Sequence, residues 1–319
     1  MKSVLLQNVT IIDGTGRETQ NAMDVLISDG RISALGRSGS LSVEREETEI
    51  HTLHGMTLLP GLIDCHVHIF ADGGSEGRIR ADEPAGLALL RAAYHVRCTL
   101  EAGITTVRDL GGQAHMEFAL RQAIAAGYCS GPRLVLAGKL LSMTSAGTEA
   151  FPGMYREADG ADEVRKAARE QLKAGADVIK VMATGAMKTY AAELPAFMAE
   201  KERQLGDAPQ RSVKAALAAA IPIAMGTDAG VPFVKHGDNA IELVLMVEAG
   251  LSPMQAIVAS TRNAARALGL QDEIGTIEVG KLADLLVVEG DPLVDIAVLA
   301  NKERIRMVVQ SGRVVVDKL

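Results

Sequence analysis

One pattern of apolar and polar residues recurs along the middle of the chain. A helix-like segment ends at Ala-Gly or a run of alanines, and an apolar, β-branched stretch follows at once, as in residues 100–107 (LEAGITTV), 172–181 (LKAGADVIKV) and, more loosely, 217–226 (LAAAIPIAMG). Glycine tolerates the left-handed conformation that ends a helix, and short connections then lead into a strand. This alternation of helix and strand predicts an α/β fold with a parallel sheet.

Five strands of this central region can be placed from the pattern. They cover residues 58–67, 104–109, 133–139, 178–183 and 221–227. The helices between them are predicted to be amphipathic, with an apolar stripe that faces the core. In the helix after Pro84 this stripe comprises Leu87, Leu90, Tyr94 and Cys98.

Short strands separated by turns mark both ends of the chain. The pairs Asp13-Gly14 and Asp29-Gly30 predict hairpin turns near the start, and the runs LADLLVVEG and RIRMVVQSGRVVV have the same character near the finish. We therefore expect a small composite β-sandwich domain from residues 1–56 and 275–319. The larger α/β domain, residues 57–274, is inserted between them, which agrees with the common closeness of chain termini.

Composition and charge narrow the class of partner. The chain has 319 residues, is 48% hydrophobic and carries a formal net charge of −7 without a Lys/Arg-rich stripe, which argues against nucleic-acid and anionic-membrane binding and favours a small-molecule substrate. Three cysteines without a C-x-x-C spacing fit a reducing compartment. The first residues lack the apolar core of a signal peptide, and no apolar run reaches the ~18 residues of a membrane span. We expect a cytoplasmic protein.

Two histidines end the first central strand, in the run LPGLIDCHVH. Side chains two apart on a strand point to the same face, so His66 and His68 can bind one metal ion together. A hydrolytic metal site needs about three protein ligands and one open position for water. His-x-His alone is a weak signal, but its place at the end of a strand favours metal ligands over a structural pair.

The motifs PGLIDCHVH, GITTVRDLGG, ADVIKVMATG, IPIAMGTDAG with KHGDNAIEL after it, and GTIEVGKLADLLVVEGDP resemble the amidohydrolase superfamily, in its imidazolonepropionase-like and Xaa-Pro dipeptidase (prolidase)-like branch. The likeness covers most of the chain. It implies a (β/α)8 TIM-type barrel with a composite β-sandwich. It also implies a site with one or two divalent metal ions, zinc above all, at the C-terminal ends of the strands.

The resemblance assigns roles to particular residues. His66 and His68 match the metal ligands of the first strand, and Asp228 matches a last-strand aspartate that binds metal and moves a proton from the attacking water to the leaving nitrogen. Lys180 matches a fourth-strand lysine that is carboxylated in dinuclear members and bridges two metals. His236, in a glycine-containing loop just beyond Asp228, is a candidate for substrate binding, which a plain loop histidine explains equally well. His115, which follows Gly111-Gly112 after the second strand, is a weaker candidate for the same role.

The chain departs from the family pattern in one respect. The family takes two further histidine ligands from its fifth and sixth strands, and this sequence has no histidine between His115 and His236. Only 47 residues separate Lys180 from Asp228, whereas three βα units of roughly 30 residues each would need about twice that. We therefore expect strands five to seven to be missing, with a junction near residues 187–194, and at most one weakly held metal ion.

These features leave three hypotheses open. The first is a metal-dependent amidohydrolase that cleaves an amide or peptide C–N bond of a dipeptide or N-acyl amino acid, with activity impaired in this shortened chain. The second is a non-catalytic remnant or scaffold, and the third is a small-molecule binding protein. An incomplete barrel has open strand edges that favour pairing with another chain, so the sequence also leaves a homo-oligomer open.

Overall fold

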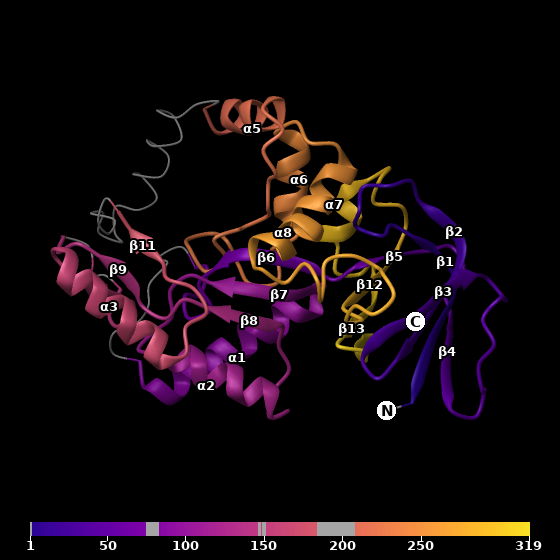
Figure 1. The fold of residues 1–319 in the computed structure, drawn as a ribbon, viewed down its shortest axis with the longest axis horizontal. Helices are drawn as coiled ribbons and strands as arrows, with labels where there is room; N and C mark the ends of the chain where they lie inside the picture. Colours follow the sequence, from indigo (N-terminus) through magenta and orange to yellow (C-terminus); the bar gives the residue numbers. More distant parts are fainter. Residues whose placement is uncertain (1, 75–82, 146–147, 149–150, 184–207) are drawn as a thin grey trace.

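Strands from both ends of the chain form one eight-stranded sheet in the computed structural model, which describes residues 2–74, 83–145, 148, 151–183 and 208–319. The strand order is β14-β13-β12-β5-β1-β2-β3, and β4 pairs with β1 on the side (Figure 1). The strands are β1 (Ser3–Ile11), β2 (Gln20–Ser28), β3 (Arg31–Arg37), β4 (Thr48–Thr52), β5 (Met56–Pro60), β12 (Leu285–Glu289), β13 (Ile305–Gln310) and β14 (Arg313–Asp317). The seam between the two ends is the antiparallel β5–β12 pair, with Leu59 opposite Leu286.

The sheet joins strands from the two chain ends and includes β5, which runs to Pro60; the division into domains 1–56 with 275–319 and 57–274 stays a prediction. The predicted turn at Asp29-Gly30 joins β2 to β3. Both residues have positive φ, 51° and 81°, as a tight hairpin turn requires. Asp13-Gly14 instead lies in the longer connection of residues 12–19 between β1 and β2. β1 and β2 do pair antiparallel, with Ile11 opposite Gln20, so the predicted hairpin is present, but its connection is longer than a tight turn.

Three parallel strands form the centre of the molecule, in the order β6-β7-β8. They are β6 (Leu62–Val67), β7 (Ile104–Asp109) and β8 (Arg133–Leu136), and the helices α1 (Ala85–Glu101) and α2 (Met116–Ala125) lie between them in sequence. The predicted strand over residues 58–67 is divided between the two sheets at Gly61, where any side chain would overlap that of Thr105. The order of strand, helix and strand confirms the predicted α/β class.

A second parallel sheet has the order β10-β9-β11. It comprises β9 (Leu140–Ser142), β10 (Tyr155–Glu157) and β11 (Val181–Met182), and the helix α3 (Ala161–Ala174) packs against β9. The strands predicted over residues 133–139 and 178–183 are shorter than expected, and β11 pairs with β9 rather than with β8. Within the described ranges the two parallel sheets are separate and neither closes into a barrel.

The prediction of a strand over residues 221–227 was wrong. Residues 225–229 do run beside β6, because Cys65 N donates to Met225 O at 2.9 Å and His68 N donates to Ala229 O at 2.7 Å. The preceding Ile221 and Pro222 are exposed, and proline has no N–H for a ladder. A strand needs several consecutive paired residues, and here only isolated bridges form, from Ala229 to Val67 and to Val231.

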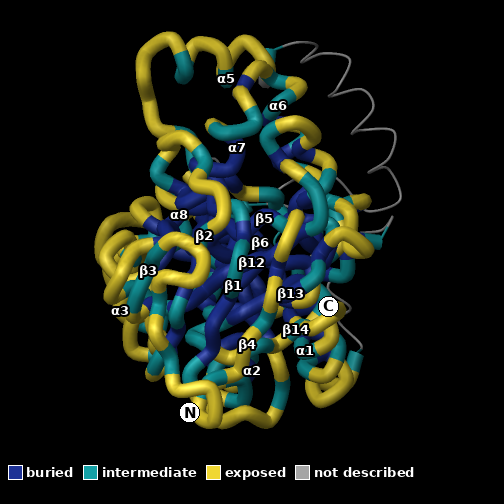
Figure 2. Tube along the Cα trace, turned by 90° about the vertical axis from the view of Figure 1, so that its right-hand side faces the viewer, coloured by how far each residue is buried: buried dark blue, intermediate teal, exposed yellow. Residues whose placement is uncertain are grey.

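Four short helices follow in the C-terminal half. They are α5 (Ala208–Ala218), α6 (Ile241–Glu248), α7 (Pro253–Ser260) and α8 (Arg262–Ala267), and a 3₁₀ turn covers Ile296–Ala300. The helices α7 and α8 contact β6, whereas α5 lies farther from the central strands (Figure 1). Ser252 and Gln255 form a capping box at the start of α7, which satisfies two free backbone N–H groups. Ala264 and Ala265 of α8 pack against Cys65. Figure 2 shows the buried residues gathered around β1, β5, β6 and β12.

The apolar stripe predicted to bury α1 faces outward instead. Leu87, Leu90 and Tyr94 are 55%, 71% and 57% exposed. The buried residues of the helix are Ala88, Ala92, His95, Val96, Thr99 and Leu100. Small side chains let the helix approach the strands closely, and the ring of His95 reaches the carbonyl of Ile69, so a face with fewer large apolar groups is the one that packs.

The predicted junction near residues 187–194 lies outside the described residues. None of the helices in the described ranges combines the length and the apolar character needed to cross a membrane.

A partly exposed arginine, Arg133, pairs with the buried Asp284 and connects the two main sheets. Asp284 is 4% exposed; it accepts from Nη1 of Arg133 at 2.5 Å and from Ser311 N at 2.7 Å. We expect Asp284→Ala to lower the free energy of unfolding by about 3 kcal/mol, because a charged donor and a backbone N–H lose their acceptor. Urea unfolding measures it. Asp162→Ala, which breaks an exposed pair with Arg165, should cost less than about 1 kcal/mol; equal losses would contradict the prediction.

Candidate metal centre

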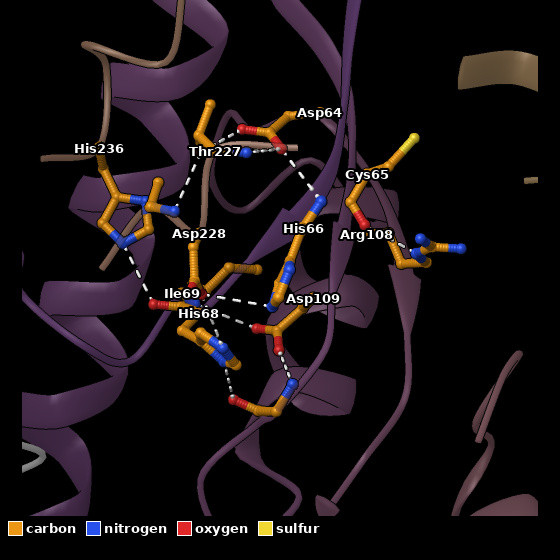
Figure 3. A network of polar contacts seen from close by, with 12 residues as sticks. Asp64, Cys65, His66, His68, Ile69, Arg108, Asp109, Thr227, Asp228 and His236 are labelled. Carbon is orange, nitrogen blue, oxygen red and sulfur yellow. Dashed lines mark hydrogen bonds and ion pairs between the residues drawn. The ribbon is translucent and has the colours of Figure 1, made fainter. Parts of the chain in front are cut away.

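Two histidines and one aspartate converge at the end of β6 (Figure 3). Nε2 of His66 lies 3.3 Å and Nε2 of His68 lies 3.1 Å from Oδ1 of Asp228. The two histidines follow the strand alternation, and Asp228 comes from the neighbouring segment, whose N–H donates to His66 O at 2.8 Å. Among the described residues, these three form the one group of His, Cys, Asp or Glu whose ligand atoms all lie within 4.8 Å of one another. The structure therefore brings together three of the four predicted metal ligands.

The chemistry of this group fits a divalent metal ion. Oδ1 of Asp228 is buried without a well-aligned hydrogen-bond partner, although two imidazole nitrogens face it. Ligands ~2.0–2.2 Å from a tetrahedral zinc ion lie roughly 3.3–3.6 Å from each other, close to the distances between these atoms. Asp228 holds a positive φ of 59°, which is uncommon for a residue other than glycine. Its backbone is thus held in a conformation that directs the carboxylate at the histidines.

The ionisation of the three groups also suits metal binding. Burial lowers the pKa of His66 to about 4 despite the opposing charge of Asp228, so this imidazole is neutral near pH 7 with a free lone pair. Burial opposes the charging of His68, but Asp228 outweighs it and raises the pKa. The pKa of Asp228 is lowered by the histidines, although its own burial acts the other way. A metal ion must therefore displace a proton from His68.

Asp64 holds together the two segments that carry the group, the end of β6 and the loop around Thr227. Its side chain is fully buried and accepts from His66 N, from Thr227 N, from Oγ1 of Thr227 at 2.6 Å and from Nδ2 of Asn239 at 2.7 Å. Burial raises the pKa of Asp64, although these hydrogen bonds act against the rise. Sequence reasoning missed this residue. Its position two residues before His66 on the same strand face was the available signal.

Two further buried carboxyl groups lie near His68, at the end of β7 and in the first turn of α2. Asp109, at the end of β7, accepts from Gly111 N and Ile69 N, and burial raises its pKa. Glu117, in the first turn of α2, packs against Gly112, where any side chain would overlap its carboxyl group. Both oxygens of Glu117 are buried without a hydrogen-bond partner, and burial together with Asp109 raises the pKa to about 8. Neither residue was predicted.

The remaining candidates lie outside the group of three. The charge of half-buried Lys180 lowers the pKa of both His66 and Asp228, so its ammonium group lies near the site, and its carbonyl accepts from Leu141 N. His115 is the N-cap residue of α2 and its Nε2 lies 2.7 Å from Oε1 of Gln171. The role of Lys180 as a metal ligand stays a prediction. So does the role of His115 in substrate binding.

His236 is directed at backbone rather than at the metal group. Its Nε2 lies 3.2 Å from His68 O and 3.0 Å from Ala71 O. Carbonyls only accept hydrogen bonds, so this nitrogen carries a proton. Burial lowers the pKa of His236 to about 3, with a further contribution from the neighbouring His95. The predicted role of His236 in substrate binding stays a prediction.

Comparison with known proteins identifies the family of this chain. The sequence profile of the Amidohydrolase family matches residues 57–206 and, separately, residues 201–315. Among curated proteins, an ochratoxinase of Aspergillus niger is 25% identical over 417 aligned positions, which cover 95% of this chain and 84% of that protein. An imidazolonepropionase of Maricaulis maris is 28% identical and covers 82% of this chain and 85% of that protein.

Solved structures agree. The crystal structure of a Xaa-Pro dipeptidase with bound methionine in the active site superposes with a TM-score of 0.83 at 27% identity, covering 98% of this chain and 99% of that one. An amidohydrolase crystal structure gives a TM-score of 0.85 at 26% identity, covering 99% of this chain and 100% of that one. With two family segments that span most of the sequence, this chain belongs to the amidohydrolase family, in the branch that contains imidazolonepropionases and prolidase-like proteins.

Proposed function

We propose that this chain is a metal-dependent hydrolase for the C–N bond of a small amide or peptide substrate. The observation that carries the proposal is the convergence of His66, His68 and Asp228, with Oδ1 of Asp228 buried and facing two imidazole nitrogens at 3.3 Å and 3.1 Å. Three protein ligands with room for water are the usual arrangement of a catalytic zinc site. Membership of a family of hydrolases supports the same reaction class.

The residues of the site have two roles, metal binding and proton transfer. His66, His68 and Asp228 would hold a divalent ion, zinc in our proposal, which when bound lowers the pKa of water and polarises the scissile carbonyl. Asp228 is also the proton carrier. Its side chain is 45% exposed although Oδ1 is buried, so Oδ2 is the oxygen that can accept a proton from water and pass it to the leaving nitrogen. Asp64 holds the backbone of His66 and of Thr227 in place.

The substrate proposed is a dipeptide or an N-acyl amino acid. The names of the Xaa-Pro dipeptidase and the imidazolonepropionase that this chain resembles support a C–N bond in a small molecule. Lys180 supports the dipeptidase-like alternative, because a lysine near the site could be carboxylated. The charge of Lys180 already acts on His66 and Asp228.

We propose that the barrel of this chain lacks three strands and that the site therefore holds at most one metal ion, weakly. Two observations support this shortening. The family profile matches in two segments that meet at residues 201–206, and the alignment with the ochratoxinase has 417 positions although this chain has only 319 residues. A site with fewer ligands and less surrounding structure holds its metal less firmly. A scaffold or binding role without catalysis is the alternative that the same observations favour.

The test is hydrolysis of Xaa-Pro dipeptides and N-acyl amino acids with added Zn²⁺ or Co²⁺, using Asp228→Ala as the control. We expect slow, metal-dependent release of amino acid that Asp228→Ala abolishes, because imperfectly held ligands lose orders of magnitude in rate. Metal-bound protein without any turnover on the whole panel would establish the scaffold or binding role. Rapid turnover that Asp228→Ala abolishes would contradict the expected impairment but would support the proposed hydrolase activity.

A further inference from the structure

Side chains from outside the metal group contact every carbonyl of the turn that follows β6. Nε2 of His236 lies 3.2 Å from the carbonyl oxygen of His68 and 3.0 Å from that of Ala71. The carbonyl of Ile69 lies 2.8 Å from Nδ1 of His95. The carbonyl of Phe70, between them, accepts from Nη1 of Arg91 at 2.7 Å. The turn directly after a metal ligand is thus fixed by three side chains.

We propose that His236, stacked on His95, is a positioning residue that sets the place of His68 in the metal centre. The inference rests on the proposed metal-dependent function, and it assigns to His236 a role through the backbone of a ligand rather than through the substrate. The rings of His95 and His236 are stacked, with centroids 4.6 Å apart and planes at 19°. One ring therefore holds the other while each bonds the turn of residues 68–71.

The segment that carries His236 also reaches the other histidine ligand. Gly237 N donates to Oδ1 of Asn239 at 2.9 Å, and Nδ2 of Asn239 donates to Oδ2 of Asp64 at 2.7 Å. Asp64 in turn accepts from His66 N at 3.0 Å. Residues 236–239 therefore contact His68 directly and His66 through one carboxylate, so a single segment fixes both ends of the His-x-His pair.

Close backbone packing leaves little freedom at this contact. Gly230 lies against the carbonyl of His68, and any side chain at Gly230 would overlap that oxygen. Gly73 N donates to Gly230 O at 3.0 Å, and Phe233 N donates to Gly73 O at 3.1 Å. The turn after β6 and the loop after Asp228 are thus joined. A displacement at His236 would be transmitted to His68, and a ligand misplaced by a fraction of an ångström binds metal less well.

The test compares Co²⁺ binding by His236→Phe, which keeps a ring for the stack and removes the donor, and by His236→Gln, which keeps an amide donor and removes the ring. Chelator competition gives the affinity, the visible spectrum of bound Co²⁺ reports ligand geometry, and urea unfolding gives the stability of each variant. His54→Phe, at an exposed position, is the matched control. We expect His236→Phe to weaken Co²⁺ binding by about tenfold to a hundredfold and to shift the spectrum, with partial recovery in His236→Gln.

If His236 has a purely structural role, His236→Phe should lower the stability but leave the Co²⁺ affinity and spectrum of the folded protein unchanged. That result would overturn the inference about His236 and leave the proposed metal site standing. Should His236→Phe fail to fold, His236→Ala carries the test, since it removes the ring and the bonds to His68 O and Ala71 O without adding bulk; we expect at least several-fold weaker binding, and wild-type affinity would overturn the inference. If wild type and His66→Ala bind Co²⁺ equally poorly, the proposed metal site fails, and the inference fails with it.

Discussion

Replacing His68 with alanine is expected to weaken the binding of Zn²⁺ or Co²⁺ more than about a hundredfold, because changes to residues that merely support a ligand already cost about 10- to 100-fold. Its Nε2 is one of three atoms that face a common point, and the buried Oδ1 of Asp228 is 3.1 Å away. Removing the imidazole leaves His66 and Asp228, too few protein ligands for a firmly held ion.

Metal titration with chelator competition measures the loss, and His115→Ala is the control, since His115 contacts Gln171 rather than the metal group. The wild type should also bind more weakly as the pH falls, because Asp228 raises the pKa of His68 against the effect of burial and a proton then competes with the metal. His66, with a pKa of about 4, adds no competition near pH 7. Unchanged affinity in His68→Ala would show that the metal lies elsewhere.

The α/β class and the metal pair were predictable because both depend on local patterns. His66 and His68 share a strand face whatever surrounds them, and a helix that ends at glycine before an apolar run indicates a βα repeat. Asp228 needed the family resemblance, since nothing in the spacing of 160 residues connects it to His68. The structure supplies that connection through backbone hydrogen bonds between β6 and residues 225–229.

The predictions that failed depend on which surface the rest of the molecule covers. The pattern of α1 contains two faces that could be buried, and the one with Ala88, Ala92 and Val96 is buried because it allows close approach to the strands. The segment expected as a strand over residues 221–227 is bonded to β6 at one point, where Cys65 N donates to Met225 O, and to a helix at another, where Met225 N donates to Ala259 O. The periodicity of a sequence predicts an amphipathic segment, but the neighbouring elements determine which of its faces is buried and what it pairs with.

Buried carboxyl groups were missed for a related reason. Asp64, Asp109 and Glu117 are fully buried, yet in sequence each is an ordinary acidic residue of a kind that is usually exposed. Only tertiary structure shows that Asp64 has four hydrogen bonds, whereas Glu117 has none. That contrast gives the second large effect we expect.

Stability should fall as the pH rises from about 5 to about 8, because of Glu117. Burial and Asp109 raise the pKa of this carboxyl group from 4.5 to about 8, so the folded protein keeps a proton that the unfolded chain releases. The contribution of the neutral acid is therefore fully present below pH 4.5 and is lost as the pH rises through about 8. A shift of this size corresponds to roughly 4 kcal/mol at pH 8.

Glu117→Gln removes the titration and keeps nearly the same shape, so we expect it to raise the free energy of unfolding by up to roughly 4 kcal/mol at pH 8 and to change it little at pH 5, where the wild-type acid is already neutral. Urea unfolding at both pH values measures the difference. Glu101→Gln is the control, because the Glu101 side chain is 54% exposed and its replacement should alter stability by less than about 1 kcal/mol at either pH. A Gln variant that is no more stable than wild type at pH 8 would show that the Glu117 carboxylate has a partner, such as a bound cation, that offsets its burial.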